Sequence, residues 1–128
     1  MIQLKMEHKI LEETLKGEAF AHIKYSLYAD QAEKEGYLKI AREFRRIAAQ
    51  ELNEHFMEIA SFYGLVKDTK SNLRQAMKCE KHEFTILYPQ FAHEMEKLDH
   101  LDIADRYDEL AQDEEKHYNV FASLEKTI

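Results

Sequence analysis

The chain has 128 residues, a formal net charge of −7, 45% hydrophobic and 34% charged residues, and a single cysteine. This length fits one domain, residues 1–128, with a core of its own, whereas the acidic balance argues against nucleic-acid binding and the lone cysteine against a disulfide or a Cys-x-x-Cys metal site. No apolar run approaches the ~18 residues of a membrane span, and the N-terminal MIQLKMEHKI lacks a signal-peptide core, so we expect a cytoplasmic protein without membrane contact.

Helical apolar spacing begins close to the N-terminus. The first helix is predicted over about Leu4–Glu33 and ends at a turn that contains Gly36. The second is predicted over about Leu38–Tyr63 with Gly64 as its C-cap, because glycine tolerates the left-handed conformation that closes many helices. The chain has only three glycines and one proline, which favours long helices.

Two more helices are predicted in the second half. The third covers about Asn72–Lys97, and its candidate N-caps are Asp68, Thr69 and Ser71. Pro89 lies inside it and should kink it or remove one backbone hydrogen bond. The fourth runs to about Glu125, with Asp99 or Asp102 as its N-cap. Four long helices without strand candidates predict an all-α, four-helix bundle.

The two halves of the chain resemble each other. LKGE at 15–18 aligns with MKCE at 77–80, an offset of 62 residues, and IAREFRRIAAQELNE at 40–54 aligns with IADRYDELAQDEEKH at 103–117, an offset of 63. The bundle is therefore predicted to be a doubled helical hairpin, with hairpin 1 over about 4–63 and hairpin 2 over about 71–126. The repeat pairs Glu51 with Glu114 and Glu54 with His117.

Each predicted helix carries a carboxylate within its apolar stripe: Glu18, Glu51, Glu80 with Glu83, and Glu114. Burying several ionised carboxylates costs several kcal/mol each without compensation, and most lysines and arginines fall on outward positions. Metal ions resolve this conflict, and two Glu plus Glu-x-x-His motifs form the di-iron site of carboxylate bundles. Glu114-x-x-His117 is such a motif. We predict that the remaining histidines lie on the surface or make minor polar contacts, His22 being the least certain of them.

The chain resembles the rubrerythrin family in its ferritin-like di-iron domain. The resemblance rests on KGEAFAHIKYSLYADQAEKEGY (16–37), IAAQELNEH (47–55), CEKHEFTILYPQFA (79–92) and AQDEEKH (111–117). It implies two iron ions, reduction of hydrogen peroxide in defence against oxidative stress, and the metal ligands Glu18, Glu51, Glu80, Glu83, Glu114 and His117. It also implies that Tyr25 and Tyr88 lie near the site, where they would hydrogen-bond ligands and hold their orientation.

The chain departs from this family at two points. Family members usually carry a rubredoxin-like domain, whose four cysteines this chain lacks, so a separate donor protein such as a rubredoxin should supply electrons. The family also has Glu-x-x-His on the second helix, where both the repeat and the count from Gly36 place Glu54. His55 is the alternative ligand if the helix contains a π-bulge. With Glu54 as ligand, Glu54 and Glu83 would be the carboxylates that shift with oxidation state, and the anionic site would also admit manganese.

The link between the second and third helices is short for a ferritin-like bundle, in which these helices run parallel after a long crossover. The link should cover roughly 32 Å, estimated from the helical rise, whereas about seven residues reach only ~25 Å. Either the third helix runs antiparallel, or the hairpins exchange between two chains. We favour a homodimer with hairpin exchange, in which Glu18, Glu51 and Glu54 of one chain face Glu80, Glu83, Glu114 and His117 of the other.

The same residues are compatible with two other functions, and the sequence does not separate the first of them from peroxide reduction. A ferroxidase or iron-binding protein would use the same ligands to oxidise Fe(II) with dioxygen or peroxide, without sustained peroxidase turnover. A metal-free helical interaction module would need partners for its buried carboxylates, and replacing Glu51 or Glu114 by Ala should then stabilise the fold.

Overall fold

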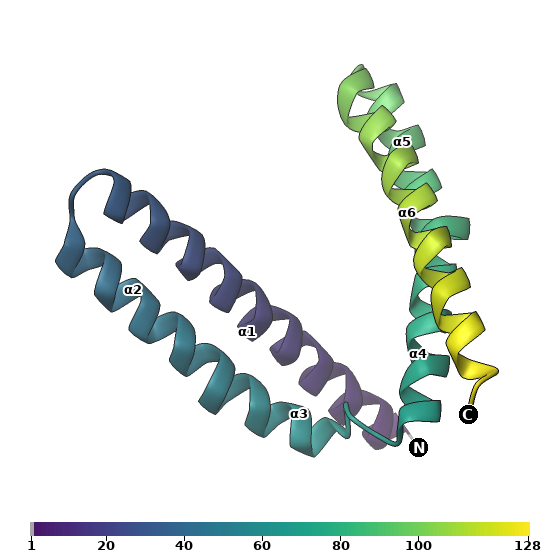
Figure 1. The fold of residues 1–128 in the computed structure, drawn as a ribbon, viewed down its shortest axis with the longest axis horizontal. Helices are drawn as coiled ribbons and strands as arrows, with labels where there is room; N and C mark the ends of the chain where they lie inside the picture. The colour runs from purple at the N-terminus through teal and green to yellow at the C-terminus, as the bar shows by residue number, and fades with distance from the viewer. Residues whose placement is uncertain (1) are drawn as a thin grey trace. The chain divides into compact units, whose positions relative to one another are not determined.

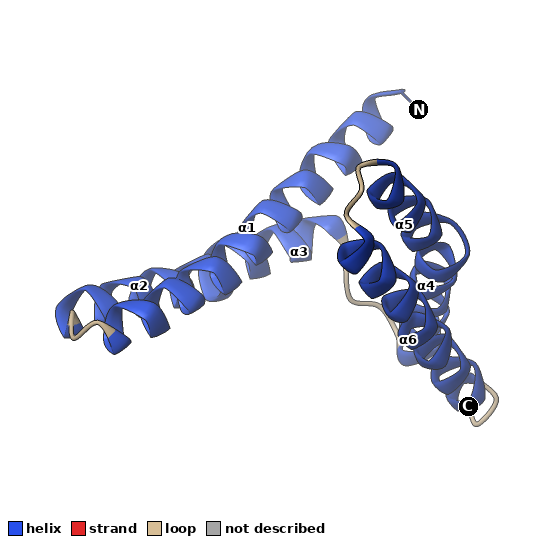
Figure 2. Ribbon diagram, turned by 90° about the horizontal axis from the view of Figure 1, so that it is seen from above, coloured by secondary structure: helices blue, strands red, loops and turns tan. Residues whose placement is uncertain are grey.

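The computed structural model describes residues 2–128, which are helical apart from short connections (Figures 1 and 2). The elements in chain order are α1 (Ile2–Lys34), α2 (Leu38–Gln50), the π-helix η1 (Glu51–Phe56), α3 (Met57–Tyr63), α4 (Thr69–His82), the π-helix η2 (Glu83–Leu87), α5 (Tyr88–Lys97) and α6 (Leu101–Glu125). Residues 2–128 contain no strand, and none of their helices is long and apolar enough to cross a membrane.

The chain divides into two compact units at Val66 and Lys67. In the first unit α1 packs along α2, η1 and α3, and we call this pair of helices hairpin 1. In the second unit α6 packs along α4, η2 and α5, and we call this pair hairpin 2. The predicted all-α fold of two helical hairpins is confirmed.

The two hairpins turn in the same way. Gly36 and Asp99, 63 residues apart, both have left-handed backbone conformations, with φ of 86° and 62°. The following residue then donates back to the last helical turn, from Tyr37 N to Ala32 O at 2.8 Å and from His100 N to Met95 O at 2.9 Å. Asp is one of the few non-glycine residues that tolerates this conformation. The predicted N-cap role of Asp99 or Asp102 is wrong, because Asp99 forms the turn, and His100 occupies the N-cap position of α6 without a side-chain bond.

The predicted signals around the link between the hairpins are borne out. Gly64 closes α3 with φ 73°, and the next residue, Leu65, donates to Ala60 O at 3.1 Å. Asp68 caps α4, because its Oδ1 accepts from Ser71 N at 3.0 Å and its Oδ2 from Ser71 Oγ at 2.7 Å. These bonds hold the pKa of Asp68 below its usual value. Pro89 lies in the first turn of α5, directly after η2, so its missing N–H falls where the helix pattern already changes.

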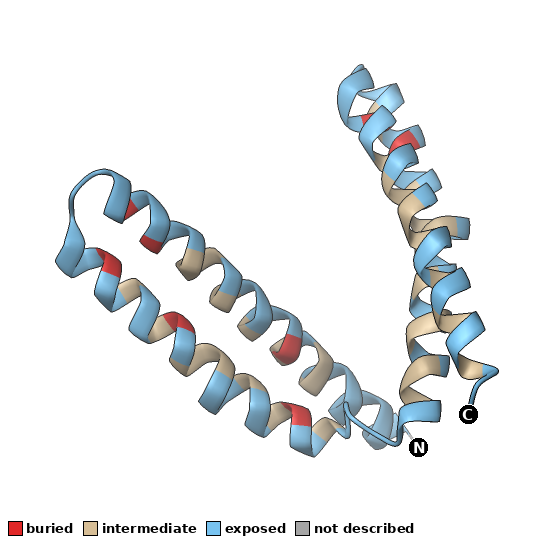
Figure 3. Ribbon diagram, viewed as in Figure 1, coloured by how far each residue is buried: buried red, intermediate tan, exposed pale blue. Residues whose placement is uncertain are grey.

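Only a few positions of each hairpin are buried, as the red segments of the ribbon show (Figure 3). The buried apolar residues of hairpin 1 are Leu15, Ala29, Ala32, Ala41, Ala48 and Ala60, and those of hairpin 2 are Ala92 and Ala104. All but Leu15 are alanines. Larger side chains such as Ile10, Phe20, Ile86 and Val120 remain more than half exposed. A two-helix hairpin buries only one stripe of each helix, so each hairpin keeps apolar surface that needs a further partner.

Candidate metal centre

The first group of possible metal ligands lies in hairpin 1 and consists of Glu18 on α1 with Glu51 and His55 on η1. His55 Nδ1 lies 3.4 Å from Glu18 Oε2 and 3.4 Å from Glu51 Oε1. The two carboxylates are largely covered, with 24% and 17% of their side chains exposed, whereas the imidazole is 47% exposed. We call this group the hairpin 1 cluster.

The second group lies in hairpin 2 and has the same three residue types: Glu80 on α4 with Glu114 and His117 on α6. His117 Nδ1 lies 3.1 Å from Glu114 Oε2 and 3.6 Å from Glu80 Oε1. The exposed fractions, 17% for Glu80, 15% for Glu114 and 55% for His117, repeat those of hairpin 1. We call this group the hairpin 2 cluster.

The negative charges of the carboxylates in both clusters are poorly compensated by hydrogen-bond donors or cations. A hydrogen bond with Glu51, together with burial, raises the pKa of Glu18. Burial, followed by the hydrogen bond and charge of Glu114, raises the pKa of Glu80 to about 7. Among residues 2–128, Glu18 Oε2 and Glu80 Oε2 are both buried without a hydrogen-bond partner, although His55 Nδ1 lies 3.4 Å from the former. One buried carboxylate oxygen per hairpin therefore lacks a donor, which is costly unless a cation binds there.

The donor sets fit a transition metal. In each cluster one ligand atom from each of the three residues lies within 4.8 Å of the others. Carboxylate oxygen and imidazole nitrogen together suit iron, manganese and zinc, and a cation would meet the unpartnered oxygens and lower the pKa of the carboxyls. The clusters are therefore groups that could each hold a metal ion.

His55, and not Glu54, joins the hairpin 1 cluster. The Glu54 side chain is exposed and accepts a hydrogen bond from Gln50 Nε2 at 3.1 Å. The repeat favoured Glu54 because it assumed α-helical spacing through Glu51–Phe56, whereas this segment is the π-helix η1. A π-turn holds one extra residue, so the fourth residue after Glu51 occupies the place that the third occupies in an α-helix.

The offsets of the repeat identify where extra residues entered each hairpin. Glu18 and Glu80 are 62 residues apart, Tyr25 and Tyr88 are 63 apart, and Glu51 and Glu114 are 63 apart. His55 and His117 are again 62 apart. Hairpin 2 therefore has one extra residue between Glu80 and Tyr88, where η2 lies, and hairpin 1 has one between Glu51 and His55, where η1 lies. Each π-helix accommodates one inserted residue without disturbing the helix on either side.

η2 begins at Glu83, whose equivalent under the 62-residue offset is Ala21. The extra carboxylate of hairpin 2 thus has no counterpart in hairpin 1. Burial, and then the charge of Glu114, raises the pKa of Glu83. Glu83 lies outside the three-residue cluster, close enough to Glu114 for their charges to interact.

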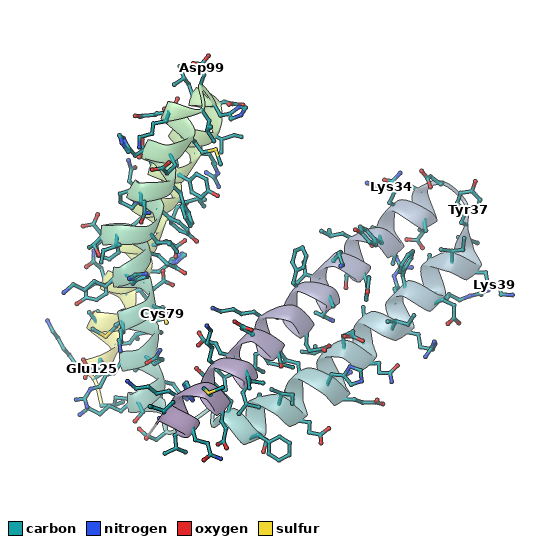
Figure 4. All side chains as sticks on the ribbon, turned by 180° about the vertical axis from the view of Figure 1, so that it is seen from behind. Lys34, Tyr37, Lys39, Cys79, Asp99 and Glu125 are labelled. Atoms are coloured by element: carbon teal, nitrogen blue, oxygen red, sulfur yellow. The ribbon has the colours of Figure 1, made fainter. Side chains whose placement is uncertain are left out.

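The two predicted tyrosines are half-buried. The Tyr25 ring stacks on Phe44 with centroids 6.0 Å apart, and the Tyr88 ring lies 5.7 Å from that of Tyr107. Burial, and then the charge of Glu83, raises the pKa of Tyr88. Within residues 2–128 neither phenol makes a hydrogen bond to a cluster carboxylate, so their orienting role stays a prediction. Cys79 is exposed on α4 beside Glu80 (Figure 4) and lies 3.5 Å from Gln75 Nε2.

The sequence comparison agrees with this geometry. The sequence profile of the Rubrerythrin family matches residues 9–125. The chain is 34% identical to rubrerythrin of Porphyromonas gingivalis, with 84% of this chain and 60% of that protein aligned. It is 32% identical to rubrerythrin-1 of Clostridium acetobutylicum, with 88% and 66% aligned, and 32% identical to rubrerythrin of Nitratidesulfovibrio vulgaris, with 88% and 65% aligned.

The chain spans 60 to 66% of the length of these three relatives. The matched region includes both clusters, both π-helices and the turns of both hairpins. The profile matches most of the chain, and the all-α fold and the two Glu-Glu-His clusters agree with it. The chain therefore belongs to the rubrerythrin family.

Proposed function

We propose that this chain is a di-iron oxidoreductase that reduces hydrogen peroxide to water. The observation that carries the proposal is the pair of matched clusters, Glu18–Glu51–His55 and Glu80–Glu114–His117, each with a buried carboxylate oxygen that has no donor. Two such clusters, brought together in one bundle, supply the two-metal carboxylate and histidine ligand set of ferritin-like proteins.

The proposed ligands divide by burial. Glu18, Glu51, Glu80 and Glu114 are the covered carboxylates that would hold the metals, and His55 and His117 would each add one imidazole nitrogen. When bound, two ferrous ions supply the two electrons that reduce the O–O bond of one peroxide. The balance also requires two protons per peroxide, giving two waters. Glu83 lies beside Glu114 and is the proposed carboxylate that adjusts its position and carries protons.

In this proposal the electrons for further turnovers come from a rubredoxin-type donor outside these 128 residues. The chain has one cysteine, which cannot form the four-thiolate iron site of a rubredoxin-type carrier.

The link between the hairpins supports assembly from two chains. Tyr63 lies 12 residues after Glu51, and Thr69 lies 11 residues before Glu80. A parallel arrangement with both clusters at one level would need the link to span roughly 34 Å, at 1.5 Å of rise per residue. The five residues Gly64–Asp68 reach only about 22 Å fully extended. We therefore propose that hairpin 1 of one chain completes its site with hairpin 2 of a second copy.

The test is metal analysis and optical spectroscopy of protein purified without oxygen. Two irons per pair of clusters, rapid di-ferric absorption on adding hydrogen peroxide, and repeated turnover with a reduced rubredoxin would support the proposal. Iron that is oxidised and retained, without turnover, would instead make the protein a ferroxidase. A chain that takes up no Fe(II) would overturn the proposed function, and the metal-free interaction module would then be the better account.

A further inference from the structure

One polar contact of hairpin 1 is not explained by the metal clusters. His22 lies one turn after Glu18 on α1, and its Nδ1 lies 2.7 Å from the backbone carbonyl of Ala48. A carbonyl oxygen can only accept, so His22 Nδ1 carries the proton and donates. The ring is half-buried, and the bond joins α1 to a backbone carbonyl of α2. The other side-chain hydrogen bonds between α1 and α2 within residues 2–63 run from the exposed Arg45 to Asp30 and Glu33.

The accepting carbonyl stands where the helix changes its hydrogen-bond pattern. Ala48 lies in the last turn of α2, three residues before η1 begins at Glu51. The Glu51 N–H is shared there between Ile47 O and Ala48 O. In a π-helix each backbone N–H donates to the carbonyl five residues earlier, instead of the one four residues earlier. The regular pairing of N–H and carbonyl groups changes at the junction, so an additional hydrogen-bond donor stabilises a carbonyl there. His22 supplies that donor.

Hairpin 2 lacks this contact and also lacks the π-helix at the equivalent place. The 62-residue offset puts Phe84 at the position of His22, and Phe84 has no side-chain donor. Its ring instead meets Tyr118 edge-on with centroids 5.8 Å apart. The matching stretch of α6 stays α-helical through Glu114 and His117. The imidazole donor and the π-helix therefore occur together in hairpin 1. At the equivalent places hairpin 2 has a phenylalanine and a regular α-helix.

We propose that His22 is a positioning residue for the hairpin 1 cluster. Its hydrogen bond to Ala48 O holds η1 in the π geometry, and this geometry turns His55, instead of Glu54, toward Glu18 and Glu51. The identity of the metal ligand on this helix thus depends on a histidine that does not touch the metal. The part of this inference that concerns ligation rests on the proposed function, whereas the part that concerns the shape of η1 does not.

The experiment compares two substitutions in the full-length protein. His22→Asn keeps an N–H donor close to the Nδ1 position, and His22→Leu keeps similar bulk without a donor. Each variant is examined as a metal-free crystal structure, and then loaded with Co(II) for proton NMR, where each imidazole bound to the paramagnetic ion gives one strongly shifted N–H signal. The wild type and His22→Asn should show η1 and two such signals. His22→Leu should show α-helical spacing from Glu51 to Glu54 with the π-turn moved past His55, one signal, and Co(II) binding weaker by roughly tenfold or more.

The outcomes separate this inference from the proposed function. A metal-free His22→Leu structure that keeps η1, with His55 still against Glu18, would overturn the positioning role, as would His22→Asn behaving like His22→Leu. If the wild type binds no Co(II), the proposed function fails, but the metal-free structures still decide whether His22 holds η1. Should His22→Leu not fold, His22→Phe, which copies hairpin 2, replaces it with the same expected results.

Discussion

At the scale of single residues, the choice between two neighbours on η1 sets the chemistry of the site. His55 contacts Glu18 and Glu51, whereas Glu54 is exposed and bonded to Gln50. With His55 as a ligand, both hairpins offer two carboxylates and one imidazole. The expectation of an unusually anionic centre that favours manganese depended on Glu54 as a ligand, and therefore loses its basis.

Paired substitutions test this choice directly. His55→Ala should weaken Fe(II) or Co(II) binding by roughly tenfold or more, because it removes a nitrogen from the donor set. Glu54→Ala is the matched control, and its effect on the free energy of unfolding should stay within about 0.5 kcal/mol, as for other exposed positions. Calorimetric metal titrations measure the first effect and denaturant unfolding the second. Metal loss in Glu54→Ala with normal binding in His55→Ala would return the ligand role to Glu54.

The titration of Glu80 predicts how the metal-free protein responds to pH. Its pKa is about 7 in the fold, raised mainly by burial, against an ordinary value of 4.5. Between these values the folded chain holds a proton that the unfolded chain has released, so stability is greatest at the lower pH and is lost as the pH rises through about 7. The pKa shifts of Glu18 and Glu83 act in the same direction.

Denaturant midpoints of metal-free protein from pH 5 to pH 8 check this response. The midpoint should fall over this range in the wild type, and Glu80→Gln, which cannot ionise, should fall less. Identical slopes for the two proteins would show that Glu80 does not titrate in this window.

At the scale of secondary-structure elements, the two π-helices behave as single-residue insertions. Deleting Asn53, which is exposed within η1, leaves Glu51 and His55 in the three-residue spacing of Glu114 and His117. The segment should become α-helical, since the extra residue is gone. We therefore expect this deletion variant to fold with a melting temperature close to that of the wild type and to bind metal.

The control is a deletion of Arg46, which is equally exposed but lies in the regular helix α2. Removing one residue there rotates the two sides of the helix by about 100° relative to each other. The buried Ala41 and Ala48 could then no longer face α1 together, and a loss of several kcal/mol in the free energy of unfolding is expected. Equal melting temperatures for the two deletion variants would contradict the insertion account.

Much of the element pattern was predictable from sequence because it depends on local chemistry. Gly36, Gly64 and Asp68 mark turns and caps that any helix of this kind requires, and the repeat paired the two hairpins correctly. Asp99 was misassigned because aspartate serves both as an N-cap and in left-handed turns. A π-bulge at η1 was considered only as the alternative that would make His55 a ligand, and η2 was not predicted, because apolar periodicity assumes 3.6 residues per turn throughout. The two offsets of the repeat, 62 and 63, were the one signal of an inserted residue.

At the scale of the whole molecule, hairpin exchange can be tested by mixing two inactive variants. Glu51→Ala damages only hairpin 1, and Glu114→Ala damages only hairpin 2. In an exchanged heterodimer one site receives both defects, and the other receives intact hairpins from each chain. Purified heterodimers carrying two different tags should therefore regain about half of the wild-type peroxide turnover per dimer.

Each variant alone serves as the control and should be inactive. If every site were built within one chain, each site of the heterodimer would carry one defect, and mixing would restore nothing. Recovery of activity in the heterodimer, with a loss of that activity when its chains are separated by dilution, would establish that sites form between chains. Failure of the heterodimer in spite of correct metal analysis of the wild type would favour the antiparallel alternative.

The matched clusters and their separate insertions have a consequence for the origin of the chain. A single hairpin of about sixty residues that paired with its own copy would already have placed two Glu-Glu-His sets face to face, as duplicated folds allow. η1 lies in the second helix of hairpin 1, whereas η2 lies in the first helix of hairpin 2. The two length differences therefore lie at different positions of the repeat and are independent of each other. The two halves now differ at these places, where Glu83 matches Ala21 and His22 matches Phe84.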